Sequence, residues 1–203
     1  MIELVLSWIA NIVIVIINST GYLGIFLLMA LESANIPVPS EIIMPFSGFL
    51  VFGGNFSFWL VVLAGTFGNL FGSLVSFRFA EWIVASRSKF KLISHIFSEK
   101  FLYKSHVWFE KYGYWSVFFS RLLPVARTFI SLPAGLAKMN IWKFSILTLF
   151  GSFIWSWILT YIGLFLGVNW HTLGKYFRQL DLLILVIVLI LFFWWLYNHN
   201  KRH

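Results

Sequence analysis

The chain has 203 residues, of which 60% are hydrophobic and 11% charged, and it contains no cysteine. A soluble protein of this size needs more charged residues to form a surface around so many apolar side chains. The composition therefore predicts an integral membrane protein with one domain. The lack of cysteine excludes disulfides and thiolate metal sites, and the formal net charge of +8 fits loops at an anionic membrane surface better than nucleic-acid binding, because the basic residues flank hydrophobic segments.

The N-terminal quarter contains two apolar segments, and polar residues interrupt the second. Residues 4–18 are apolar but short for a full span, so they predict a tilted or partial membrane helix. Residues 22–52 are interrupted by carboxylates, prolines and a glycine, which predict a broken helix. These interruptions are Glu32, Pro37, Pro39, Glu41, Pro45 and Gly48.

The middle of the chain predicts one span followed by an interfacial segment. Residues 56–80 are apolar and long enough to cross a bilayer. Within them, Gly68 and Gly72 have the small-xxx-small spacing that lets membrane helices approach closely, which is compatible with a homodimer. Residues 84–112 alternate basic and aromatic side chains, which indicates an amphipathic stretch at the membrane interface.

A second broken segment places two arginines in an otherwise apolar run. An arginine at bilayer mid-depth costs about 2.5–3.5 kcal/mol on insertion scales, so Arg121 and Arg127 need partners or a wet cavity. Pro124 and Pro133 each remove a backbone donor, and Gly135 follows them. This pattern predicts a broken helix that forms half of a substrate site.

The two broken segments share a pattern that indicates an internal repeat. In each, a Pro-Val pair, at 37–38 and at 124–125, is followed by a glycine eleven residues after the proline. We interpret residues of about 21–80 as the first copy and about 113–167 as the second, each ending in one span. A last helix is predicted at about 181–198.

The predicted fold class is an all-α integral membrane protein built as an inverted repeat. If each broken segment is a re-entrant hairpin, the single span between them places the two hairpins on opposite faces of the membrane. Outside the broken segments, basic residues divide eleven to two between the two sides. By the positive-inside rule the richer side is cytoplasmic, and both termini lie on it.

Four charged side chains are the candidate site. Opposed hairpins would bring Glu32 and Glu41 toward Arg121 and Arg127, and mutual pairing would offset the cost of burying them. Arginine makes bidentate bonds to phosphate oxygens, so the two arginines are candidates for binding a lipid phosphate. A carboxylate displaced by that phosphate would take up a proton, which makes either glutamate a candidate for proton coupling. The alternative is that the four charges only pin the hairpins together.

The chain resembles the DedA family, also known as the SNARE-associated or VTT domain group, over roughly residues 20–167. The matching positions of the second half are Arg121, Pro124, Arg127, Ala134, Gly135, Met139, Phe144, Gly151 and Trp155. In the first half, Glu32 and residues 39–41 resemble the family's acidic hairpin. Phe77 and Ala80 depart from the pattern, because the family usually has Tyr and Gly there.

The resemblance implies a lipid transporter of a bacterial cytoplasmic membrane, without a cofactor and without enzymatic activity. Family members are described as flippases of undecaprenyl phosphate or of phospholipids. The family's functional acids fall on Glu32 and Glu41, and its functional arginines on Arg121 and Arg127. We therefore expect a proton-coupled flippase that recycles a polyprenyl phosphate carrier. The open alternatives are a phosphatidylethanolamine or general phospholipid flippase or scramblase, a proton-driven exchanger of small ions or drugs, and a membrane phosphatase of lipid pyrophosphates.

Overall fold

The computed structural model describes residues 2–36, 38–86, 107, 109, 113–124 and 126–167, and among residues 1–9 it describes the side chain of Trp8 alone. This part of the chain is all-helical, as predicted. Its helices are α1 (Ile2–Thr20), α2 (Tyr22–Ser33), α3 (Ser40–Phe52), α4 (Phe58–Ser86), α7 (Trp115–Arg121), α8 (Ala126–Phe129), α9 (Ser131–Leu136) and α10 (Ile141–Phe165). Most of the predicted interfacial segment 84–112 and all of the predicted helix 181–198 lie outside the described residues.

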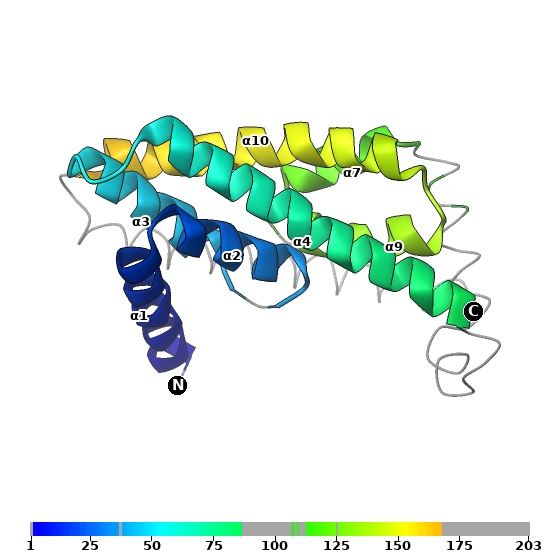
Figure 1. Ribbon diagram of the computed structural model, residues 1–203, viewed down its shortest axis with the longest axis horizontal. Helices are drawn as coiled ribbons and strands as arrows, with labels where there is room; N and C mark the ends of the chain where they lie inside the picture. Colours follow the sequence, from blue (N-terminus) through cyan, green and yellow to red (C-terminus); the bar gives the residue numbers. More distant parts are fainter. Residues whose placement is uncertain are drawn as a thin grey trace, which may run out of the picture.

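Two helices, α4 and α10, are long and apolar enough to cross a membrane by length and composition. Both run along the long axis of the molecule and contact each other where they cross (Figure 1). The two long apolar helices are therefore confirmed, although α4 runs further than the predicted span 56–80. Near this end of the helix, Arg78 and Glu81 form a 2.9 Å ion pair at the surface. An exposed pair of this kind stabilises a helix only slightly.

Prolines lie at several of the helix breaks, but Pro45, which was predicted to interrupt its segment, lies inside α3 without ending it. Helix α3 begins directly after Pro39, whose extended conformation separates it from α2, and Pro124 lies in the turn between α7 and α8. Pro133 lies within α9, and because it has no N–H the carbonyl of Phe129 receives no helical donor, so α8 ends there. Pro37 lies outside the described residues.

Glycines inside the helices allow each broken segment to rest on the long helix of the other half. Helix α3 packs on α10, where a Cβ at Gly48 would meet the backbone of α10 and one at Gly163 would overlap the backbone of Pro45. Helix α9 packs on α4, where a Cβ at Gly135 would overlap the backbone of Phe77. Gly48 and Gly135 are thus positions of close helix contact and not, as predicted, the points at which the helices break.

The Gly68 and Gly72 pair is used within the chain. A Cβ at either position would overlap the backbone of α2, at Phe26 and Ala30 respectively. The spacing therefore brings α2 onto α4, as small residues do between membrane helices. This contact accounts for both glycines without a second copy of the chain.

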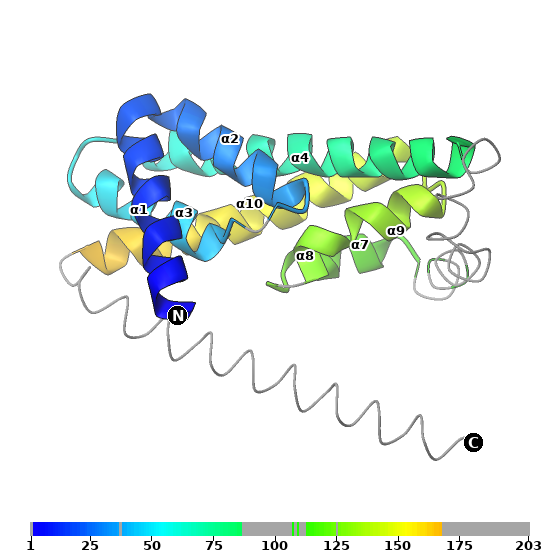
Figure 2. The same ribbon diagram turned by 90° about the horizontal axis from the view of Figure 1, so that it is seen from below.

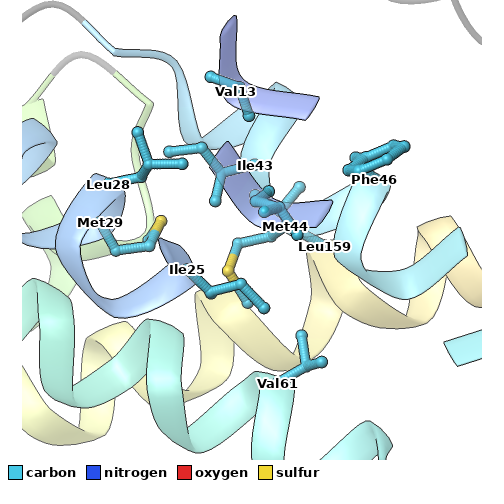
Figure 3. Packing of buried hydrophobic residues seen from close by; sticks show 10 residues of the cluster. Val13, Ile25, Leu28, Met29, Ile43, Met44, Phe46, Val61 and Leu159 are labelled. Carbon is cyan, nitrogen blue, oxygen red and sulfur yellow. The ribbon is translucent and has the colours of Figure 1, made fainter. Parts of the chain in front are cut away.

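The largest hydrophobic core lies in the first half of the protein. Its ten fully buried residues come from α1, α2, α3, α4 and α10 (Figure 3), and they include Val13, Met29, Met44 and Leu159. Phe77 of α4, in the first half, and Phe144 of α10, in the second half, are both buried, with ring centroids 4.7 Å apart. Contact between the two long helices thus joins the two halves of the chain.

The broken segments occupy opposite ends of the molecule and approach each other near its middle. Figure 2 shows α2 and α3 toward one end of α4 and α10, and α7, α8 and α9 toward the other. Helix α8 contacts α2 where the two groups meet. This meeting point brings together residues that are far apart in the sequence.

Candidate functional site

Three of the four predicted charged residues are buried where the broken segments meet. Glu32 in the last turn of α2, Arg121 at the end of α7 and Arg127 in α8 are 5%, 1% and 2% exposed. Glu41 lies in the first turn of α3 and is half-buried. Charged side chains are almost never buried to this extent unless they are paired or hydrogen-bonded, so their partners define the site.

Glu32 and Arg127 form an ion pair across the two halves of the chain. Nη2 of Arg127 donates to Oε2 of Glu32. The other terminal nitrogen of this guanidinium, Nη1, is buried and has no hydrogen-bond partner among the described residues. A buried guanidinium N–H without an acceptor is costly, so Arg127 has an unused donor available to an anion.

Arg121 is held by neutral groups. Its Nη1 donates to the backbone carbonyl oxygen of Arg127 at 2.7 Å, and its Nη2 donates to Oγ of Ser131 at 2.8 Å. Longer contacts of 3.4 Å reach Oδ1 of Asn69 on α4 and Oγ1 of Thr148 on α10. One guanidinium therefore ties together α4, α7, α8, α9 and α10. No carboxylate of a described residue forms an ion pair with Arg121, which differs from the pairing expected for it.

The buried cluster consequently has more positive than negative charge at close range. Two guanidiniums lie there, and the described ion pairs are the Glu32–Arg127 pair and the surface pair of α4. Glu41 is near enough for its charge to act on Glu32, but it forms no ion pair with a described residue. An anion placed beside Arg127 would therefore be electrostatically favoured.

Two further residues at the ion pair were not predicted as site residues. The ring of Trp155, on α10, lies over the guanidinium of Arg127, with its centroid 5.1 Å from Cζ. Its Nε1 donates to Oγ of Ser40 at 3.4 Å, so Ser40 and Arg127 contact the same indole. The sequence analysis matched Trp155 to the family pattern and Ser40 to the acidic hairpin, and it favoured a packing role for both residues over a role in the site.

Asn69 and Thr148 were also missed as partners of Arg121. Both are buried, at 1% and 0% exposure, on the faces of α4 and α10 that point inward. A polar side chain in the middle of an apolar span is the signal that could have identified them, since such residues commonly serve as hydrogen-bonding partners between helices. Among the described residues, no group of three or more His, Asp and Glu side chains could hold a metal ion.

Comparison with known families and proteins gives a consistent picture. The family described as "VTT domain" matches residues 38–165, which include Arg121, Arg127 and Trp155. No solved structure gives a significant match to the chain.

Several curated bacterial proteins are similar to the chain along most of its length. An "Uncharacterized membrane protein YkoX" of Bacillus subtilis is 34% identical over 90% of this chain and 78% of its own. "Undecaprenyl phosphate transporter A" of Staphylococcus aureus is 33% identical over 72% of this chain and 74% of its own. An "Alkaline phosphatase-like protein" of Lactococcus lactis is 34% identical over 79% of this chain and 77% of its own.

Proposed function

Because the chain belongs to the VTT domain, or DedA, family of membrane proteins, we propose that it is a flippase that moves undecaprenyl phosphate across the cytoplasmic membrane of a bacterium. Relatives named undecaprenyl phosphate transporter A, from Staphylococcus aureus and Bacillus subtilis, are 33% and 32% identical to it. Their name supplies the substrate class, a long isoprenoid tail with a terminal phosphate. The residues of the buried site must then be able to bind a phosphate group.

The observation that carries the proposal is the buried pair of Glu32 and Arg127. It joins the two broken segments at the point where they meet, and Nη1 of Arg127 is left without an acceptor. A pair that served only to pin two hairpins would gain from satisfying every donor, since unsatisfied buried groups are destabilising. The free donor supports an anion as the group that completes the site.

The proposed arrangement in the membrane is an inverted repeat of two re-entrant hairpins. Residues of about 21–80 and 113–167 form the copies, both termini are cytoplasmic, and the hairpins enter from opposite faces. The reciprocal packing supports this arrangement: α2 rests on α4 and α7 on α10 within each copy, whereas α3 rests on α10 and α9 on α4 between copies. Two copies related by a two-fold axis would make the same contacts twice in this way.

In the proposed mechanism the lipid phosphate displaces Glu32 from Arg127. The planar guanidinium then offers both terminal nitrogens to phosphate oxygens, while the isoprenoid tail stays in the bilayer. The released carboxylate, still surrounded by apolar groups, takes up a proton. Transport is thereby coupled to protons through Glu32, with Glu41 as the second candidate.

Charge supports a phosphate monoester over a phospholipid. A monoester carries about −1.5 to −2 charges at neutral pH, which matches the two guanidiniums of Arg121 and Arg127 once Glu32 is neutral. Phosphatidylethanolamine has one phosphate charge and a compensating amine, so it would leave a buried positive charge unbalanced. Phospholipid transport therefore stands as the second choice within the transporter class.

A phosphatase is the alternative from another class, because two of the similar Lactococcus proteins are named alkaline phosphatase-like. Hydrolysis needs a nucleophile or an activated water beside the phosphate. Ser131 has a hydroxyl beside a guanidinium, but its Oγ accepts a 2.8 Å hydrogen bond from Arg121. That contact fits a structural acceptor better than a nucleophile.

The test is reconstitution of the full chain into liposomes that contain either labelled undecaprenyl phosphate or labelled phosphatidylethanolamine. We expect the first lipid to become accessible on the opposite leaflet, with Arg127→Ala inactive and Arg78→Ala, a change at the exposed surface pair, fully active. Faster movement of phosphatidylethanolamine than of undecaprenyl phosphate would show that the protein is a phospholipid flippase. Release of inorganic phosphate from undecaprenyl pyrophosphate would show that it is a phosphatase and not a transporter.

A further inference from the structure

The carboxylate of Glu32 occupies the position that an incoming anion would take beside Arg127. The groups that now stabilise this carboxylate are therefore the groups that a phosphate would meet. One of them is Nη2 of Arg127. The hydroxyl of Ser40, completely buried at the start of α3, contacts the same indole that lies over this guanidinium, which places it next to the ion pair. A serine hydroxyl can donate to a phosphate oxygen as readily as to a carboxylate oxygen.

We infer that Ser40 donates a hydrogen bond to the lipid phosphate and that Trp155 positions both Ser40 and Arg127 for that contact. The inference rests on the proposed function and deepens it, because it adds a phosphate ligand from the first half of the chain to the arginine from the second half. The site would then bind its anion by groups from both broken segments.

Trp155 is placed to act on both groups at once. Its Nε1 donates to Oγ of Ser40 at 3.4 Å, so this oxygen serves as an acceptor and the serine proton is directed elsewhere, toward the anion. Its ring face lies over the guanidinium of Arg127 at 5.1 Å, which favours one orientation of the cation. A single indole on α10 thus connects the first turn of α3 with α8.

The exposure of Trp155 is consistent with a position beside the path of the head group. Ser40 and Arg127 are buried, whereas Trp155 is half-buried, so part of its ring faces the outside of the helix bundle. Neighbouring Trp157 on the same helix is exposed and stacks on Tyr161, with centroids 5.6 Å apart. The two tryptophans therefore differ in what they contact, which provides a matched control.

A second matched control exists for Ser40. Ser47 lies on the same helix and is equally buried, but its hydroxyl donates to the backbone carbonyl of Ile43 within α3 at 2.7 Å. Removal of this hydroxyl deletes a buried oxygen without touching the ion pair. Any effect specific to the anion must then appear in Ser40→Ala and not in Ser47→Ala.

The experiment measures binding of undecaprenyl phosphate to the full chain in lipid nanodiscs, on monodisperse protein whose thermal unfolding is recorded in parallel. We expect Ser40→Ala to weaken binding about tenfold, the usual effect of losing a hydrogen bond to a charged group, and Ser47→Ala to leave it unchanged. Trp155→Phe, which keeps the ring face and removes the N–H, should weaken binding severalfold, with Trp157→Phe unchanged.

The double variant Ser40→Ala/Trp155→Phe separates positioning from direct contact. If Trp155 acts through Ser40, the phenylalanine adds nothing once the hydroxyl is absent, and the double variant binds like Ser40→Ala alone. If the losses of affinity in Ser40→Ala and Trp155→Phe multiply fully in the double variant, Trp155 does not act through Ser40, and its positioning role is overturned. Equal affinities of Ser40→Ala and Ser47→Ala, with at most a lower unfolding temperature, would overturn the ligand role.

Arg127→Ala distinguishes failure of this inference from failure of the proposed function. Normal binding of undecaprenyl phosphate by Arg127→Ala would contradict the proposed anion site, and with it the proposed function. Loss of binding in Arg127→Ala together with normal binding in Ser40→Ala would leave the site in place and remove Ser40 and Trp155 from it.

Discussion

The backbone carbonyl oxygen of Arg127 accepts a 2.7 Å hydrogen bond from Nη1 of Arg121. One buried arginine therefore holds the peptide group that carries the other. The two residues differ in their surroundings, because Arg121 is bound to neutral oxygens on several helices and Arg127 to a single carboxylate. This difference gives the two arginines separable roles that substitution can test.

Substitution of each arginine by lysine should have different effects on stability. A lysine at position 121 cannot reach the carbonyl of Arg127, Ser131, Asn69 and Thr148 together, so we expect Arg121→Lys to lower the unfolding temperature and abolish transport. A lysine at 127 can still pair with Glu32, so Arg127→Lys should unfold near the wild-type temperature and yet lose transport through the loss of bidentate binding. Thermal unfolding and a flipping assay measure both properties. Equal loss of stability in the two variants would contradict the separation, and Arg78→Lys is the exposed control.

Removal of the carboxylate at Glu32 should uncouple transport from protons. Glu32→Gln keeps an oxygen for Arg127 but cannot be released as a carboxylate that takes up a proton. We therefore expect this variant to bind undecaprenyl phosphate and to move it at a rate independent of an imposed pH gradient. Glu41→Gln, at the half-buried acid outside the ion pair, should keep the dependence on the gradient. The reverse result would assign the proton to Glu41.

The close contact of α2 with α4 predicts that Gly72→Ala destabilises the folded chain. The added methyl group would overlap the backbone of Ala30, which cannot move aside as a side chain does. Overpacking of this kind costs typically about 1–3 kcal/mol. Gly53→Ala, where the nearest atom would lie 3.4 Å away, is the control. We expect the unfolding temperature of Gly72→Ala to fall while its oligomeric mass stays that of the wild type. A changed oligomeric mass with an unchanged unfolding temperature would instead place Gly72 at an interface between copies of the chain.

The start of α10 depends on the side chain of Asn140. Its Oδ1 accepts hydrogen bonds from the backbone N–H groups of Trp142 and Lys143, at 3.0 and 3.2 Å. Loss of such a helix cap costs about 1 kcal/mol, so Asn140→Ala should lower the free energy of unfolding by that amount. Asn140→Asp retains the acceptor and should unfold like the wild type. Equal stability of all three proteins would show that the cap contributes nothing.

Much of the fold could be predicted from the sequence, because bilayer thickness and proline chemistry act locally. The lengths of the apolar runs predicted α4 and α10, and Pro39 and Pro124 lie at helix breaks as expected. The end of α4 was not predicted from hydropathy, because the helix continues past the apolar run to Ser86 through a stretch that includes Glu81.

The partners within the site were only partly predictable. Opposite charges in two broken segments indicated that Glu32 and Arg127 would meet, since neither could be buried alone. Asn69 and Thr148 are polar residues inside apolar helices, which marks them as candidates for buried hydrogen bonds. That they reach Arg121 could not be predicted, because this depends on how the two long helices pack. Ser40 and Trp155 are ordinary residues in the sequence, and only the packing of α3, α8 and α10 places them at the ion pair.

The most direct test of the central claim is a structure of the full chain in lipid nanodiscs with undecaprenyl phosphate bound. We predict that the phosphate lies within hydrogen-bond distance of Arg127, that the carboxylate of Glu32 has moved away, and that Arg121 still donates to the carbonyl of Arg127. A head group bound elsewhere, with the pair of Glu32 and Arg127 intact, would contradict the claim.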